Sequence, residues 1–212
     1  AGLAGGFASS TATIASMGAR ARRNPELATA CVGAGVVSNV STVAQLGVVA
    51  AALSPPLLAR LWLPLAAAGA VIAVFALVAA RASRSAQVGA AEVKGRAFEP
   101  KHALLFVAIM AAVMLASAAM LAWLGDAALD ATLALSGLAD VHAAAASAAQ
   151  LVAVGRIGVE AALPAIALAF AANSAMKLGM PYATAGPGYL LRLAPGVACM
   201  VLAFALAAWF TR

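Results

Sequence analysis

Long apolar runs, each close to the length of a membrane-spanning helix, follow one another along the whole chain. A helix needs about 20 mainly apolar residues to cross a bilayer. Runs of this kind predict seven spans, at 1–19, 27–53, 60–81, 102–124, 128–154, 158–182 and 188–211. Proline, glycine or charged residues stand between the runs and end helices there. The pattern predicts an all-α integral membrane protein.

The charge content excludes a soluble protein. Only 9% of the 212 residues are charged and 65% are hydrophobic, whereas a soluble domain has about 25% charged residues. The net charge of +6 would ordinarily raise nucleic-acid binding. Here the few basic residues lie in short loops between apolar runs, so we expect a lipid bilayer as the surroundings and no nucleic-acid partner.

The basic residues predict an orientation. Ten of the 13 follow odd-numbered spans, namely Arg20, Arg22, Arg23, Arg81, Arg84, Lys94, Arg96, Lys101, Arg156 and Arg212. Arg60 and Arg192 lie beside the even-numbered loops. Because cytoplasmic loops carry an excess of lysine and arginine, we expect the odd loops and the end of the chain in the cytoplasm. The start of the chain is then expected outside.

An internal repeat is visible in the sequence. Ser9 aligns with Asp140 at a shift of 131 residues, and the segment from Ser41 to Gln45 aligns with Asn173 to Lys177 at a shift of 132. These matches predict two three-helix repeats, 1–81 and 128–212, with a basic cytoplasmic loop and a connector helix in 82–127. With one connector span both repeats run in the same direction, a parallel 3+1+3 arrangement. Coincidence in an alanine-rich chain is the alternative.

Two charged residues fall near mid-membrane in the predicted spans. Asp140 and Lys177 lie at similar depths in spans five and six. A charge at the bilayer centre costs about 2.5 kcal/mol or more, so such residues usually have a partner or a function. Three interpretations stay open: an ion or substrate site, a buried pair that locks two helices, and a Lys177 that extends outward to the interface.

Other polar residues recur near this pair. Asp140, Ser147 and Gln150 are spaced seven and then three residues apart and so share one side of a helix, and His142 points away from Asp140. Glycines before Ser9 and Asp140 favour close helix packing, or a local break whose backbone groups line a cavity. The predicted polar path comprises Asp140, Lys177, Asn173, His142, Ser9, Thr11, Ser41, Gln45, Ser147 and Gln150.

Four segments resemble a known family. Gly6–Thr13, Ala19–Arg23, Leu135–Val141 and Asn173–Lys177 are similar to the C-terminal membrane domain of certain MgtC/SapB-family bacterial proteins, a domain of unknown function. The resemblance implies a multi-pass protein of the bacterial inner membrane, with an MgtC-like domain upstream. Members usually have an acidic residue where this chain has His142, which weakens a two-acid cation site here.

These observations predict a transporter or channel for a small ion or solute, with a path between the repeats around Asp140 and Lys177. The alternative is a non-transporting regulatory or assembly partner in which that pair is a structural helix lock. No nucleotide-binding, zinc-binding or nucleophile motif is present, so we expect no enzyme, no catalytic residue and no cofactor. The sequence leaves open a metal site and a homodimer.

Overall fold

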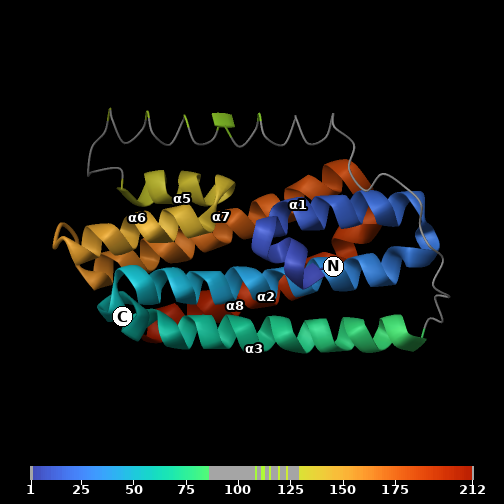
Figure 1. Cartoon of the computed structure of the whole chain (residues 1–212), viewed down its shortest axis with the longest axis horizontal. Helices are drawn as coiled ribbons and strands as arrows, with labels where there is room; N and C mark the ends of the chain where they lie inside the picture. The colour runs from blue at the N-terminus through green and yellow to red at the C-terminus, as the bar shows by residue number, and fades with distance from the viewer. Residues whose placement is uncertain are drawn as a thin grey trace.

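A computed structural model describes residues 2–85 and 129–211, together with six single positions between them. The elements of these two segments are helices (Figure 1). They are α1 (Gly2–Arg23), a 3-10 turn (Pro25–Leu27), α2 (Ala28–Leu53), α3 (Pro55–Ser85), α5 (Leu129–Ala139), α6 (Val141–Ala153), α7 (Val159–Ala185) and α8 (Pro187–Phe210). The predicted all-α class is confirmed.

Four of the described helices are long and apolar enough to cross a membrane. They cover Pro25–Leu53, Pro55–Ala82, Val159–Tyr182 and Pro187–Phe210. Large apolar side chains such as those of Trp62, Leu77, Leu202 and Trp209 are exposed on them, as lipid contact requires. The predicted span 102–124 lies outside the described residues apart from single positions.

The predicted first span is a hairpin of two half-helices. The backbone of Ser9 is extended, with φ −167° and ψ 108°, so the helix breaks there. The two halves then pack together so closely that a methyl group on Gly5 would meet Thr13 Oγ1 at 2.6 Å. The segment runs along α2 from Gly2, which lies against Ala34, to the break, and then returns toward the start of α2. It does not cross the bundle as predicted.

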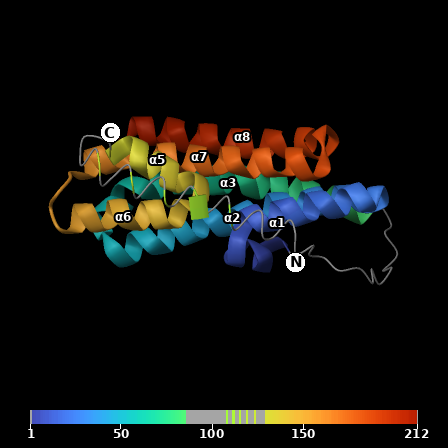
Figure 2. The ribbon, with the colours of Figure 1, turned by 90° about the horizontal axis from the view of Figure 1, so that it is seen from above.

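The predicted fifth span is a second hairpin. Asp140 has φ −155° and ψ 111° and separates α5 from α6. Figures 1 and 2 both show α5 and α6 side by side over the same half of the molecule. Close approach to α7 requires glycine here, because a side chain on Gly137 would overlap the backbone of Ala169.

The two halves run in opposite directions. Arg60 at the start of α3 donates from Nη1 to the carbonyl oxygen of Thr211, after α8, at 2.8 Å. Its Nη2 lies 3.9 Å from Glu160 Oε1, at the start of α7. At the other end, Arg22 of α1 and Arg192 of α8 line one cavity. Hence α2 and α3 run antiparallel to their counterparts α7 and α8.

The parallel 3+1+3 arrangement is therefore not confirmed, and within the described residues the two halves are inverted. The physical reason is that a re-entrant hairpin leaves the chain on the side where it entered, so the directions after it change. As a result, Arg156 and Thr211 lie at the end opposite Arg22, although the loops after spans one, five and seven were expected on one side. The boundaries at 81 and 128 stay predictions, since most of 82–127 is outside the described residues.

Helices α2 and α7 form the centre of the bundle. Each contacts the hairpin of its own half and that of the other half, since α2 packs on α1 and α6 and α7 packs on α5, α6 and α1. Helices α3 and α8 pack along them, and the rings of Phe170 and Phe204 stack with centroids 4.7 Å apart. This arrangement brings the two hairpin tips together (Figure 2).

Candidate functional site

The tips of the two hairpins face a common cavity of about 560 Å³. Its polar lining is Ser9, Ser10, Thr11, Gln45, Asp140, His142 and Asn173, and Phe7, Val48 and Val49 are among its apolar residues. The two broken helices thus contribute equivalent positions to one cavity between the halves.

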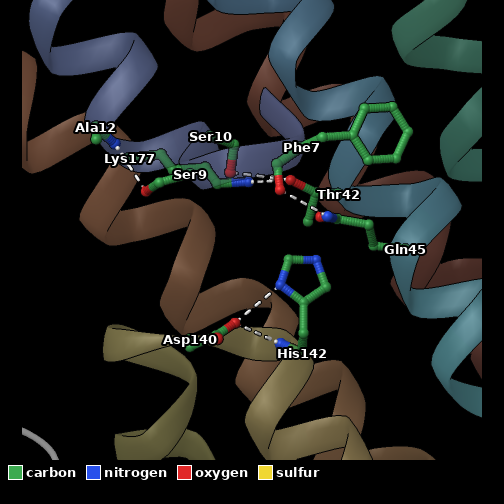
Figure 3. Close-up of polar contacts among 9 residues, drawn as sticks. All are labelled: Phe7, Ser9, Ser10, Ala12, Thr42, Gln45, Asp140, His142 and Lys177. Carbon is green, nitrogen blue, oxygen red and sulfur yellow. Dashed lines mark hydrogen bonds and ion pairs between the residues drawn. The ribbon is translucent and has the colours of Figure 1, made fainter. Parts of the chain in front are cut away.

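The first tip is held by side chains that replace the missing helical hydrogen bonds. Ser9 Oγ accepts from the backbone N–H of Ala12 at 3.3 Å, which caps the second half of α1. Gln45 Nε2 of α2 donates to the carbonyl oxygen of Phe7 at 2.9 Å (Figure 3). Bonds of this kind are needed where a helix is broken within an apolar environment.

The second tip carries the charge. Asp140 Oδ1 accepts from the backbone N–H of His142 at 2.8 Å and lies 2.8 Å from His142 Nδ1 (Figure 3). The carboxylate therefore caps α6 and binds the imidazole in front of it. The Nε2 atom of His142 is buried and has no hydrogen-bond partner in the part of the chain that the structure describes, and the residue lines the cavity.

Lys177 lies behind the cavity and is fully buried. Its Nζ atom donates to Thr42 Oγ1 at 2.9 Å and to Asn39 Oδ1 at 3.1 Å, both on α2. Thr42 in turn donates to Ser10 Oγ at 3.0 Å, at the start of the second half of α1 (Figure 3). The ammonium group of α7 is thus connected to the other half of the molecule as far as the hairpin tip.

The described residues contain no direct ion pair between Asp140 and Lys177. Each is bound elsewhere, the carboxylate to His142 and the ammonium to Asn39 and Thr42. A helix lock made by the two charges in contact is therefore not what the structure shows, and Lys177 does not extend outward to the interface.

The structure brings most of the predicted path together. Six of its ten residues line the cavity, namely Asp140, Asn173, His142, Ser9, Thr11 and Gln45. Ser41 stands beside it and donates to the carbonyl oxygen of Leu3 at 3.0 Å. Lys177 stands behind it, as described above.

Two predicted path residues lie elsewhere. Ser147 and Gln150 are exposed on α6 and do not line the cavity, and Ser147 donates to the carbonyl oxygen of Ala143 in its own helix. The prediction assumed a continuous helix through Asp140. Because the helix breaks there, Asp140 leaves the face of Ser147 and Gln150, and His142 meets Asp140 instead of pointing away.

Three residues of the site were missed by the sequence reasoning: Ser10, Asn39 and Thr42. Their signal was the density of polar residues, since Ser38, Asn39, Ser41 and Thr42 fall within five positions of an otherwise apolar span, and all four are buried. In a membrane helix such a cluster must find partners inside the bundle.

The cavity offers polar ligands but little charge. In the part of the chain that the structure describes, no group of three or more His, Cys, Asp or Glu side chains is placed to hold a metal ion. Among the described lining residues, Asp140 carries the carboxylate and His142 the imidazole. Hydroxyl and amide groups supply the remaining polar contacts.

The chain belongs to a family of unknown function. Residues 1–186 match the model of the domain of unknown function DUF4010. No curated protein and no solved structure gives a significant match.

Proposed function

We propose that the protein is a transporter or channel of the inner membrane, and that a small ion or polar solute passes through the cavity between the hairpin tips. The observation that carries the proposal is the meeting of two inverted re-entrant hairpins, at Ser9 and Asp140, around one cavity. In many transporters the substrate site lies between inverted repeats and is formed by discontinuous helices.

The chemistry of the lining supports this proposal. Non-helical backbone at membrane depth is tolerated where it lines a cavity or is buried in protein, and both breaks border the cavity. In our proposal Asp140 is the acid that responds to an ion or a proton. Lys177 is its counter-charge behind the wall, so neutralising one changes the energy of the other.

The charges also support an orientation. Arg20, Arg22 and Arg23 end α1, and α3 ends at the same side of the bundle with Arg81. By the positive-inside rule this end is cytoplasmic, which places the loop before Glu160 outside. We also propose an MgtC-like domain upstream of this chain, on the basis of the resemblance described above. A homodimer is part of the same proposal.

One observation favours the alternative function, a non-transporting regulatory or assembly partner in the membrane. Lys177 is sealed among Asn39 and Thr42, and this contact joins the two halves of the molecule. A buried clamp of this kind is what a rigid assembly module needs. It differs from the expected lock in that Asp140 is not part of it.

Flux through liposomes tests the transport proposal. Purified protein is reconstituted, gradients of Na⁺, K⁺, Cl⁻ or protons are imposed, and potential-sensitive and pH-sensitive dyes report movement. We expect flux of at least one of these ions, lowered tenfold or more by Asp140→Asn and unchanged by Ser147→Ala, which alters an exposed residue outside the cavity.

A second measurement does not depend on the transported species. Ser9→Cys is prepared after Cys31 and Cys199 are replaced by alanine, and intact cells are treated with a charged, water-soluble thiol reagent. Labelling of Cys at position 9 is expected, because the cavity must be reached by water. If the cysteine is not labelled from either side of the membrane and no flux is detected, the transport proposal is rejected in favour of the non-transporting membrane partner.

A further inference from the structure

A second cavity, of about 240 Å³, lies at the end of the bundle where α1 ends and α8 begins. It is lined by Arg22, Arg192, Tyr189 and Val32 together with small residues and Pro25. Within the described segments it shares no lining residue with the cavity at the hairpin tips. An inference from it therefore stands apart from the proposed transport function.

Among the described residues, no acidic side chain lines this cavity. Arg22 and Arg192 come from different halves of the molecule, both are exposed, and neither makes a hydrogen bond or ion pair within the described segments. Next to the lining residue Ala21, the Nε atom of Arg20 is buried and has no hydrogen-bond partner among the described residues. Glu26 is exposed nearby in the chain but does not line the cavity.

The inner wall is largely apolar. The Tyr189 hydroxyl donates to the carbonyl oxygen of Cys31 at 3.4 Å, which fixes the ring against α2, and Val32 and Ala28 continue that wall. On the other side Gly188 has no atom within 4 Å of the place where a side chain would begin. The site thus combines two guanidinium groups at the helix ends with an apolar surface along the helices.

We propose that this cavity binds the phosphate group of an anionic ligand, either the headgroup of an anionic phospholipid or a small soluble phosphate compound. Guanidinium groups match phosphate oxygens in bidentate geometry. Basic pockets between membrane helices at the cytoplasmic side bind anionic headgroups, and this cavity lies at the end where Arg20, Arg22 and Arg23 gather. The apolar wall would receive the first part of an acyl chain.

Lipid binding to the purified full chain tests this inference. Native mass spectrometry in a neutral detergent measures the Kd of dioleoyl phosphatidylglycerol and of dioleoyl phosphatidylcholine. We expect tighter binding of phosphatidylglycerol, weakened roughly fivefold by Arg22→Gln and by Arg192→Gln, since each arginine near the surface contributes about 1 kcal/mol. Arg81→Gln removes the same charge at the same end outside the cavity and is expected to bind like the wild type.

Competition identifies the source of the phosphate. If inorganic phosphate and glycerol 3-phosphate do not displace phosphatidylglycerol, the ligand is a lipid. If they displace phosphatidylglycerol, and their own binding requires Arg22 and Arg192, the phosphate site is supported and its ligand is a soluble phosphate compound. If Arg192→Gln does not fold, Arg192→Lys takes its place in the experiment. It keeps the charge but not the bidentate geometry, so we expect a Kd between that of the wild type and that of a variant without the charge.

Two results would overturn the inference. One is equal affinity for the two lipids. The other is a loss with Arg81→Gln as large as that with Arg192→Gln, because binding would then reflect the diffuse charge of this end of the bundle.

Discussion

Ser9 and Asp140 interrupt their helices in nearly the same backbone conformation, with φ of −167° and −155° and ψ of 108° and 111°. Each uses a side-chain oxygen to cap the half-helix that follows, and each lines the same cavity. They lie 131 positions apart, at equivalent places of the repeat. The two tips therefore share a backbone conformation and a capping oxygen but differ in charge. The capping role of Asp140 can thus be tested separately from an ion-dependent role of its carboxylate.

Substitutions at Asp140 should resolve these two roles. Asp140→Ser copies the first tip, so we expect stability within a few tenths of a kcal/mol of the wild type and loss of ion-dependent function. Asp140→Ala removes the cap as well and should lower the free energy of unfolding by about 1 kcal/mol. Thermal unfolding in detergent, measured beside liposome flux, compares them. Equal destabilisation by both substitutions would show that the charge, and not the cap, holds this tip.

The tip glycines should tolerate no side chain. A methyl group on Gly6 would meet the Ser38 carbonyl oxygen at 2.7 Å, and one on Gly137 would overlap the Ala169 backbone. We expect Gly6→Ala and Gly137→Ala to cost about 1–3 kcal/mol each.

Gly179→Ala is the matched control for both. No atom lies within 4 Å of its side-chain position in α7, so alanine there should be neutral or stabilise the helix by up to about 1 kcal/mol. The three proteins are compared by unfolding midpoint in one detergent. A neutral Gly6→Ala would contradict the close packing of the first tip.

Lys177 and Thr42 should be energetically coupled. Lys177→Met leaves the Thr42 and Asn39 oxygens without their buried donor, at a cost of about 1–3 kcal/mol. Thr42→Val leaves the buried ammonium with one fewer acceptor and should cost at least as much. In a double-mutant cycle the combined variant should be less destabilised than the sum by about 1 kcal/mol or more.

The control for this cycle pairs Lys177→Met with Ser147→Ala, an exposed and distant site, and should be additive. Unfolding in a mixed detergent series supplies the free energies. Additivity of the Lys177 and Thr42 substitutions would mean that the 2.9 Å contact contributes nothing to the joining of the two halves.

Cysteine labelling distinguishes inverted from parallel repeats. Val154→Cys and Glu26→Cys are prepared with Cys31 and Cys199 replaced by alanine, and cells are treated with an impermeant thiol reagent. Residue 154 lies near the start of α7 and residue 26 at the start of α2, at opposite ends of the bundle. We expect position 154 to react in intact cells and position 26 to react only after lysis. Reaction of both from one side is the result that parallel repeats require.

Much of the architecture could be read from residue patterns. The apolar runs identified α2, α3, α7 and α8, because the length and apolarity that a helix needs to cross a bilayer are properties of its own residues. The match of Ser9 with Asp140 identified equivalent positions, and six of the ten predicted path residues line the cavity. The direction of the second half of the molecule relative to the first was not predicted correctly. Hydropathy measures the length of an apolar run, and a hairpin of two half-helices has the same length as one crossing.

The sequence by itself determined that the chain is helical, that its helices are apolar enough for a membrane, and that Asp140 and Lys177 are charged residues deep within apolar segments. Only the tertiary structure decided that two apparent spans turn back on themselves and that the halves are inverted. It also decided that Lys177 bonds to Asn39 and Thr42 while Asp140 bonds to His142. The reason is that a helix break depends on partners such as Gln45 and Ala169, which lie more than 30 positions away in the chain.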